Sequence, residues 1–341
     1  MKTKNVALAL SSGGPRGFAY IGAIEVLQER GYRITSVAGA SAGALVGGIF
    51  AAGGLDAFKE WLYGLDPVQV VSLMDYAPSK NYLVKGDRVI RAIRKRVPDV
   101  RIEELPIPFA AVATDLFTGE EVVFREGPLF DAIRASISIP SMFRPVKWRG
   151  RTLVDGGLVN TFPLGRVQRS GDDILVGFNV NRIDAEGIGN YLAARQALSD
   201  DEAALRDKAQ TALKDTLSSD AGLIDKVRTA GRRGSRLLRE RRDTEHLTRL
   251  LDAAGRDNWI PVGADDNYAS ILQRSFGIMN HTIARMGIEL CPPDILVNLP
   301  FDSYHGVYGY SHAEEIAQKG RELMSEALDR YEASCTEARE A

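Results

Sequence analysis

Short apolar runs alternate with amphipathic stretches through the first half of the chain. Residues 6–10 (VALAL) and 34–40 (ITSVAGA) are apolar runs that predict buried strands. Residues 18–30 carry apolar side chains at helical spacing up to Gly31, which predicts a helix that ends there. Residues 42–54 are so rich in small side chains that we expect a closely packed helix. Strands and helices that alternate in this way are typical of an α/β layer fold.

The alternation continues to about residue 182 and resumes near the C-terminus. Residues 86–97 (GDRVIRAIRKRV) have the spacing of an amphipathic surface helix, with Asp87 placed to cap it. Residues 109–124 predict a hairpin that turns near Thr118 and Gly119. The remaining predicted elements are a helix over 128–140 ended by Pro140, a strand entering a glycine turn over 152–160, a core strand over 173–180, a helix over 269–287, a strand over 294–300 and a final helix over 311–333.

The chain changes character near Ile183. From there to about Asp257 it is highly charged and nearly free of β-branched runs, with leucine or alanine at positions 205, 209, 213 and 217. Apolar residues four apart lie on one face of a helix, so this stretch predicts a helical insertion. We therefore expect three parts, namely a core over 5–182, the insertion over 183–257 and a C-terminal completion of the core over 258–341.

Composition limits the class of protein. The 341 residues contain 43 lysines and arginines and 45 acids, a formal charge of −2, which argues against nucleic-acid binding as the main role. The two cysteines form no disulfide framework and no metal-ligand pattern, so we expect a reducing compartment and no metal. The apolar run near the N-terminus is too short for a secretory signal, and no run is long enough to span a membrane. These features favour a cytoplasmic protein.

Three segments that could carry binding or catalytic chemistry lie where predicted strands end. The first is the glycine-rich stretch SSGGPRG, residues 11–17, between a strand and a helix. Its glycines let the backbone turn tightly and expose N–H groups that could bind a phosphate or an oxyanion. The motif is neither a P-loop nor a dinucleotide-binding fingerprint, and a plain turn would also explain it. Pro15 has no N–H, so the donors would come from Gly13, Gly14, Arg16 and Gly17.

The second segment is GASAG, with Ser41 between Gly39 and Gly43. It matches the G-x-S-x-G pattern of a nucleophile elbow, in which small flanking residues allow the serine to sit on a strained turn with its hydroxyl exposed. The alternative is a serine that caps the N-terminus of the following helix. The pentapeptide alone does not decide between the two.

The third segment is Asp155-Gly156-Gly157, at the end of a strand. A carboxylate in this place could accept the proton of a serine hydroxyl, although Asp-Gly is also a common turn. A Ser-His-Asp triad would need one of the four histidines, and His305 is the one that lies in a loop with aromatic neighbours. A dyad of Ser41 and Asp155 needs no histidine.

Taken in order, these segments resemble the patatin-like phospholipase family, in its bacterial branch. The likeness includes the glycine-rich loop Gly13–Gly17, the nucleophile motif Gly39–Gly43, an A-S-x-x-x-P block at Ala135–Pro140 and the D-G-G motif Asp155–Gly157. It extends over about residues 5–182. The sequence departs from the family at Ser12, where many relatives have a further glycine, and at Pro15, which takes the place of a small residue.

The resemblance implies a patatin-like three-layer α/β/α sandwich with a mainly parallel central sheet. It also implies a serine acyl hydrolase of the phospholipase A, lysophospholipase or esterase type, in which Ser41 attacks the ester and Asp155 acts as the base. The glycine loop would form the oxyanion hole, and no cofactor would be needed. The alternatives are a non-catalytic lipid- or protein-binding member of the family, or a Ser-His-Asp hydrolase.

The predicted insertion contains the most uneven charge distribution in the chain. The segment from Lys226 to Arg242 contains eight lysines and arginines but only one glutamate. Such a segment attracts anionic lipid headgroups, which makes it a candidate lid or a peripheral membrane contact. The simpler interpretation is a solvated helix, because few apolar residues accompany the charges.

Overall fold

The central sheet positions the candidate residues. It belongs to one of the two units into which the chain divides. The computed structural model describes residues 4–77, 82–189, 192–193, 196, 268–304 and 308–340. One unit comprises residues 1–183 and 271–341, and the other comprises residues 184–270. The predicted insertion lies almost wholly outside the described residues, and its basic segment Lys226–Arg242 lies entirely outside them.

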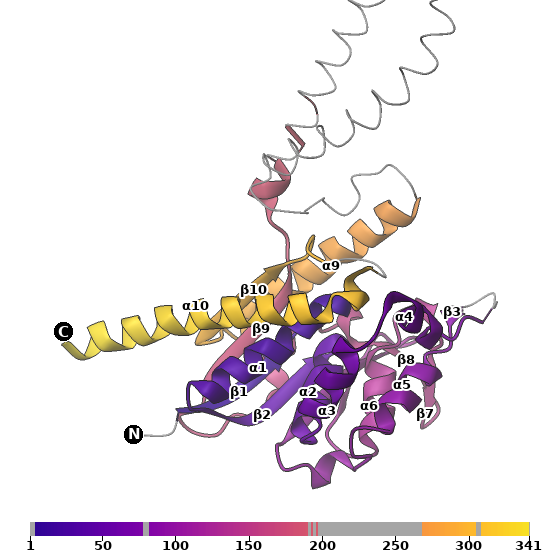
Figure 1. Ribbon diagram of the computed structural model, residues 1–341, viewed down its shortest axis with the longest axis horizontal. Coiled ribbons are helices and arrows are strands. Elements are labelled where there is room, and N and C mark those ends of the chain that lie inside the picture. The colour runs from indigo at the N-terminus through magenta and orange to yellow at the C-terminus, as the bar shows by residue number, and fades with distance from the viewer. Residues whose placement is uncertain are drawn as a thin grey trace, which may run out of the picture. The chain divides into compact units, whose positions relative to one another are not determined.

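The central sheet is mainly parallel (Figure 1). Its strands lie in the order β10-β9-β1-β2-β4-β8-β7, and β5 also pairs with β4. The first five strands of this order are parallel neighbours, whereas β5, β8 and β7 join by antiparallel pairing. The strands are β1 Lys4–Leu10, β2 Tyr32–Ala40, β4 Phe109–Asp115, β5 Glu121–Phe124, β7 Val146–Trp148, β8 Arg151–Asp155, β9 Ile174–Arg182 and β10 Ile295–Pro300.

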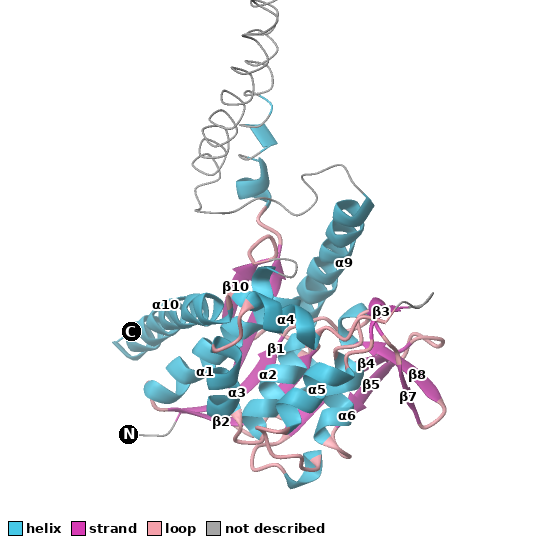
Figure 2. Cartoon of the chain, turned by 45° about the vertical axis from the view of Figure 1, so that its right-hand side comes forward, coloured by secondary structure: helices cyan, strands magenta, loops and turns pink. Residues whose placement is uncertain are grey.

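Helices cover both faces of the sheet (Figure 2). Side chains of β1 alternate between two apolar clusters, with Val6, Leu8 and Leu10 on one face and Ala7 and Ala9 on the other. Both faces of a parallel strand are buried in such a fold, which explains why β1 is a continuous apolar run. The helices are α1 Ala19–Glu29, α2 Ala42–Ala51, α3 Leu55–Tyr63, α4 Pro67–Leu73, α5 Asp87–Arg94, α6 Leu129–Ser136, α9 Tyr268–Leu290 and α10 Ala313–Glu340.

The two clusters show which helices belong to which layer. Residues of α1, α2, α3, α6 and α10 pack in the larger cluster, whereas Ala284 and Ile288 of α9 pack in the smaller one. The arrangement is a three-layer α/β/α sandwich, so the predicted fold class is confirmed. No helix within the described ranges is both long enough and apolar enough to cross a membrane.

Some sequence predictions need correction. Asp87 does not cap α5, because the N-cap is Gly86, which has a φ of 78°. Asp87 instead lies in the first turn, where its carboxylate accepts a hydrogen bond from Arg144 at 2.6 Å. The helix predicted over 128–140 ends at Ser136, before Pro140.

A small two-stranded sheet was not predicted at all. It pairs β3, Tyr82–Val84, with β6, Ser141–Phe143. Each strand has only three residues, which is too few for an alternating pattern to be recognised in the sequence. Helices α3 and α4, which precede β3 in the chain, were not predicted either.

Candidate active site

Ser41 sits on a strained turn between β2 and α2. Its backbone has a φ of 51° and a ψ of −118°, a conformation that side-chain-bearing residues rarely adopt. The Ser41 N–H donates a hydrogen bond to Ser136 Oγ at 2.8 Å, and that hydroxyl donates in turn to the Val112 carbonyl at 2.5 Å. A buried side chain of α6 thus holds the strained strand-to-helix turn, which is the kind of turn that a nucleophile elbow has.

The glycines on either side of Ser41 leave no room for a side chain. A Cβ on Gly39 would lie 2.3 Å from backbone atoms of Gly43, and a Cβ on Gly43 would lie 2.2 Å from the Leu10 carbonyl oxygen. Both distances are far below van der Waals contact. The small residues of GASAG therefore allow β1, the turn and α2 to approach one another closely.

The Ser41 hydroxyl points at a carboxylate instead of capping α2. It makes no capping hydrogen bond to the helix, and it donates to Asp155 Oδ2 at 2.5 Å. Sheet register explains this meeting of residues 114 positions apart, because Ala40 pairs with Val112 on β4 while Asp155 pairs with Ala113. Strand β4 thus places the ends of β2 and β8 at the same level.

Asp155 is held from several sides. Its Oδ1 accepts a hydrogen bond from the Gly157 N–H at 2.7 Å, which leaves Oδ2 for Ser41. Its own N–H donates to the Ser138 carbonyl at 2.9 Å, and the Thr114 hydroxyl donates to its carbonyl at 2.8 Å. These contacts fix the carboxylate in one orientation.

Burial changes the proton affinity of Asp155. The side chain is almost completely buried, and loss of hydration raises the pKa of its carboxyl group from 3.8 to about 6. The hydrogen bonds from Ser41 and Gly157 oppose that rise but do not cancel it. A carboxylate with a pKa this close to neutral can accept a hydroxyl proton far better than an ordinary aspartate.

The glycine-rich loop packs beside Ser41. After β1 the chain forms a short 3-10 helix, η1, over Gly14–Phe18. A Cβ on Gly17 would lie 2.5 Å from the Cβ of Ala42, so η1 packs against the first turn of α2. Gly14 has a φ of 59° and borders the same cavity as Ser41. A Cβ on Gly13 would clash with Val180 on β9.

The side chain of Arg16 has a role that the sequence did not indicate. Its guanidinium is buried, donates through Nε to the Val180 carbonyl at 2.9 Å and stacks over Phe301 at 4.6 Å. Burial lowers the pKa of this group to about 10. The arginine side chain therefore ties η1 to β9, and any oxyanion donor from this residue would be its backbone N–H.

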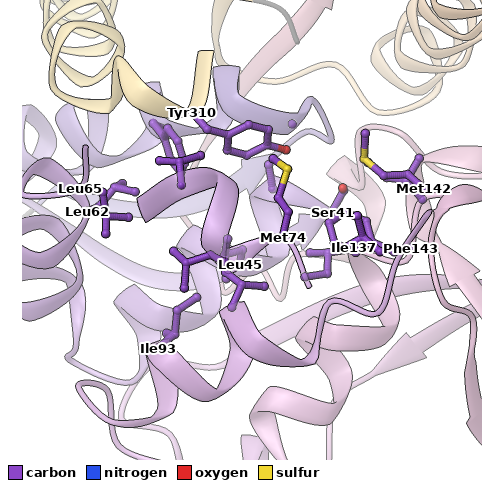
Figure 3. Close-up of a pocket in the computed structure, with 18 of the residues that line it drawn as sticks. Ser41, Leu45, Leu62, Leu65, Met74, Ile93, Ile137, Met142, Phe143 and Tyr310 are labelled. Atoms are coloured by element: carbon purple, nitrogen blue, oxygen red, sulfur yellow. The ribbon is translucent and has the colours of Figure 1, made fainter. Parts of the chain in front are cut away.

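A cavity of about 180 Å³ opens beside the Ser41 hydroxyl (Figure 3). Apart from Ser41, its wall is almost entirely apolar, and Figure 3 shows side chains from several elements around it. These lining residues are not recognisable in the sequence, since apolar spacing does not distinguish a cavity wall from a core. They include Phe18, Leu45, Phe58, Trp61, Leu62, Leu65, Val70, Leu73, Met74, Tyr76, Leu83, Ile93, Ile137, Met142, Phe143 and Tyr310.

His281 and His312, the histidines within the described residues, form hydrogen-bond contacts with groups other than Ser41 and Asp155. His281 Nδ1 lies 3.2 Å from the Ile183 N–H and 3.2 Å from the Asn181 carbonyl, and His312 lies beside Ser311 at the start of α10. In the described part of the chain, Asp155 accepts from Ser41 and Gly157 and from no histidine. His305, the triad candidate, lies outside the described residues.

Comparisons with known proteins show which chains this one is similar to. A family model described as patatin-like phospholipase matches residues 8–167. An uncharacterized NTE family protein of Mycobacterium tuberculosis is 33% identical over 351 residues, covering 96% of this chain and 92% of its own. The patatin-like phospholipase domain-containing protein 6 of Mus musculus is 26% identical over 193 residues, 54% of this chain and 14% of its own. The crystal structure of VipD from Legionella pneumophila aligns with a TM-score of 0.45 and 14% identity, covering 97% of this chain and 67% of that one.

Proposed function

Since this chain belongs to the patatin-like phospholipase family, we propose that it is a serine acyl hydrolase that cleaves acyl esters of lipids. The observation that carries the proposal is the 2.5 Å hydrogen bond between Ser41 Oγ and Asp155 Oδ2 at the wall of an apolar cavity. An apolar wall accommodates an acyl chain, and the serine and the carboxylate provide a nucleophile and its base.

The proposed reaction begins with proton transfer from Ser41 to Asp155. Oγ attacks the ester carbonyl carbon while Asp155 Oδ2 takes up the hydroxyl proton, and the carbonyl oxygen becomes an oxyanion. Backbone N–H groups of the loop at Gly13, Gly14, Arg16 and Gly17 are the proposed donors to that oxyanion. One such donor typically contributes about 3 kcal/mol to the transition state.

The tetrahedral intermediate then collapses. The bond to the alcohol oxygen breaks, the alcohol leaves with the proton held by Asp155, and the acyl group remains on Ser41 as an ester. Water next attacks this acyl-enzyme, gives a proton to Asp155 and releases a free fatty acid, after which the proton returns to Ser41. Atoms and charges balance over the two steps, and the chain's own residues carry every proton.

We propose a phospholipid, a lysophospholipid or a related acyl ester as the substrate. The products would be a fatty acid and a lysolipid or an alcohol. The cavity is lined by apolar side chains from the Ser41 hydroxyl outward, which favours the acyl chain over a charged headgroup as its occupant.

The proposal is tested with p-nitrophenyl esters of increasing acyl length. We expect Ser41→Ala and Asp155→Asn each to lower kcat by about a thousandfold or more. The matched controls are Ser36→Ala and Asp173→Asn, which alter a buried serine and a buried aspartate outside the cavity. Equal rates in all variants would exclude the dyad, and no hydrolysis by the parent chain would favour a non-catalytic binding role.

The triad alternative is tested with a third variant. A histidine-dependent mechanism predicts that His305→Ala abolishes turnover, whereas the dyad predicts that most activity remains. Mass spectrometry of lipid extracts incubated with the parent chain or with Ser41→Ala would then identify the natural acyl ester.

A further inference from the structure

Exposed apolar side chains gather where the cavity opens to solvent. Val68 on α4 is 77% exposed and Leu83 on β3 is 61% exposed, although both are aliphatic. Val71, Tyr76 and Met142 are also exposed and come from α4, the residues after it and β6. We call these five residues the mouth surface. Single exposed apolar residues are ordinary, but a group of them around a cavity indicates a contact site.

Hydrogen bonds join the backbone segments that carry the mouth surface. Strand β3 pairs with β6, and Tyr76 forms an isolated bridge with Val84. The Ala77 N–H donates to the Leu83 carbonyl at 3.0 Å, and the Asp75 carboxylate accepts from the Gly86 N–H at 2.7 Å. The apolar side chains are therefore presented by a paired framework.

The mouth surface is continuous with the candidate active site. Tyr76, Leu83 and Met142 are exposed to solvent and also line the cavity that contains Ser41. Figure 3 shows Ser41 together with Met74 and Met142, which come from different elements, on this cavity. One apolar path therefore leads from the outside of the molecule to the candidate nucleophile.

Three cations follow β3 in the chain, beside the mouth surface. Arg88 Nη1 donates to the Ser72 carbonyl of α4 at 2.6 Å, so the basic helix α5 lies against the mouth surface. Lys85 precedes α5, and Arg91 lies one turn after Arg88 on the same exposed face. Within the described residues, neither Lys85 nor Arg91 forms an ion pair.

The acids of this region are already engaged. Asp75 accepts from the backbone of Gly86 and Arg88, and Asp87 pairs with Arg144 at 2.6 Å and lies 3.6 Å from Arg134. Counting all charges of this region, the cations Lys85, Arg88, Arg91, Arg134 and Arg144 still outnumber the carboxylates Asp66, Asp75 and Asp87. Positive charge beside an exposed apolar group matches an interface that is apolar inside and anionic outside.

We propose that the mouth surface docks on the surface of an anionic lipid bilayer. Val68, Val71 and Leu83 would enter the acyl boundary while Lys85, Arg88 and Arg91 meet the phosphate groups. A second copy of this chain fits less well, because a two-fold contact would bring the same uncompensated cations together. Docking would let an acyl chain reach Ser41 without crossing water. That consequence rests on the proposed function, whereas the binding of the mouth surface to a bilayer does not.

Binding is measured by co-sedimentation with vesicles, using Ser41→Ala so that no lipid is consumed. Two kinds of vesicle are compared, phosphatidylcholine alone and phosphatidylcholine mixed with phosphatidylglycerol. Replacing Lys85 and Arg91 by glutamine should weaken binding to the anionic vesicles about 25-fold, since each cation near such a surface contributes about 1 kcal/mol. It should leave binding to the neutral vesicles unchanged.

The apolar contribution is tested separately. Val68→Gln with Val71→Gln should weaken binding to both kinds of vesicle by about tenfold or more. Matched controls are Leu290→Gln, an apolar residue 85% exposed on α9, and Lys319→Gln on α10. Binding of both mouth-surface variants at the strength of the controls would overturn the proposal. So would a change in oligomeric state on gel filtration without any change in vesicle binding.

A parallel assay separates this proposal from the catalytic one. With Ser41 intact, the Val68/Val71 and Lys85/Arg91 variants should hydrolyse a short soluble ester at the parent rate, because none of these four residues lines the cavity. They should hydrolyse vesicle lipid more slowly. A parent chain that binds vesicles through this surface but hydrolyses neither ester would refute the proposed function and leave the docking proposal standing.

Discussion

Asp155→Asn should make the protein more stable while it removes activity. Asparagine has nearly the same shape, and its Oδ1 can accept from the Gly157 N–H as the carboxylate does. Its side-chain amide can donate to Ser41 Oγ, which reverses the direction of the present hydrogen bond. The geometry therefore survives, but the variant has no base to take the Ser41 proton.

The gain in stability follows from the pKa of Asp155. Burial raises it from 3.8 to about 6. Since one pH unit corresponds to about 1.4 kcal/mol, the ionised carboxylate costs the folded chain about 3 kcal/mol at pH 8. A raised pKa contributes stability that is complete below 3.8 and is lost as the pH rises through about 6. The advantage of asparagine should thus be about half as large at pH 5.

Urea unfolding at pH 8 and pH 5 measures this difference. The parent chain, Asp155→Asn and Ser41→Ala are compared by circular dichroism. Ser41→Ala is the control, because it keeps the buried carboxylate and removes one hydrogen bond that stabilises its charge. If Asp155→Asn is no more stable than the parent at pH 8, or if its advantage does not change with pH, the ionised Asp155 does not destabilise the folded chain as expected.

Three further predictions concern activity and the turn at Ser41. Below about pH 6, kcat/KM for a soluble ester should fall about tenfold per pH unit, because protonated Asp155 cannot accept the Ser41 proton; a flat rate profile from pH 5 to 8 would contradict this. Gly43→Ala should fail to fold, because its Cβ would lie 2.2 Å from a carbonyl oxygen of β1, whereas Gly165→Ala, which meets nothing within 4 Å, should express normally. Leu45→Trp should narrow the cavity and lower hydrolysis of long-chain esters while short-chain esters are still cleaved, as measured across an acyl-length series.

Local patterns predicted the elements that position the serine. The apolar runs of β1 and β2 were recognisable because strands of a parallel sheet are buried on both faces. The small residues around Ser41 indicated a tight turn, and the clash distances at Gly39 and Gly43 give the physical reason for them. What no local pattern contains is the meeting of Ser41 with Asp155, which depends on the order β2-β4-β8 and on the register of each pair.

Other features depend on three-dimensional packing and were therefore missed. The sequence motif drew attention to Arg16 as part of the loop, but the burial of its guanidinium against Val180 and Phe301 follows from the position of β9 and the chain after β10. The cavity wall could not be recognised in the sequence for the same reason, because Leu62 on α3 and Met74 after α4 have the spacing of ordinary core residues. Whether such a residue faces a core or a cavity is decided by its distant neighbours.

Burial sets the proton affinity of Asp155, the proposed base. In a triad, a histidine with a pKa near neutral accepts the hydroxyl proton. Here the loss of water around Asp155 raises the pKa of its carboxyl group to about 6, and no nearby cation is among the causes of this shift. An acyl chain that fills the cavity would exclude further water from Ser41 and its partner. Substrate binding should therefore raise the proton affinity of Asp155 at the moment the hydroxyl proton must leave, and the proposed dyad would then need no imidazole.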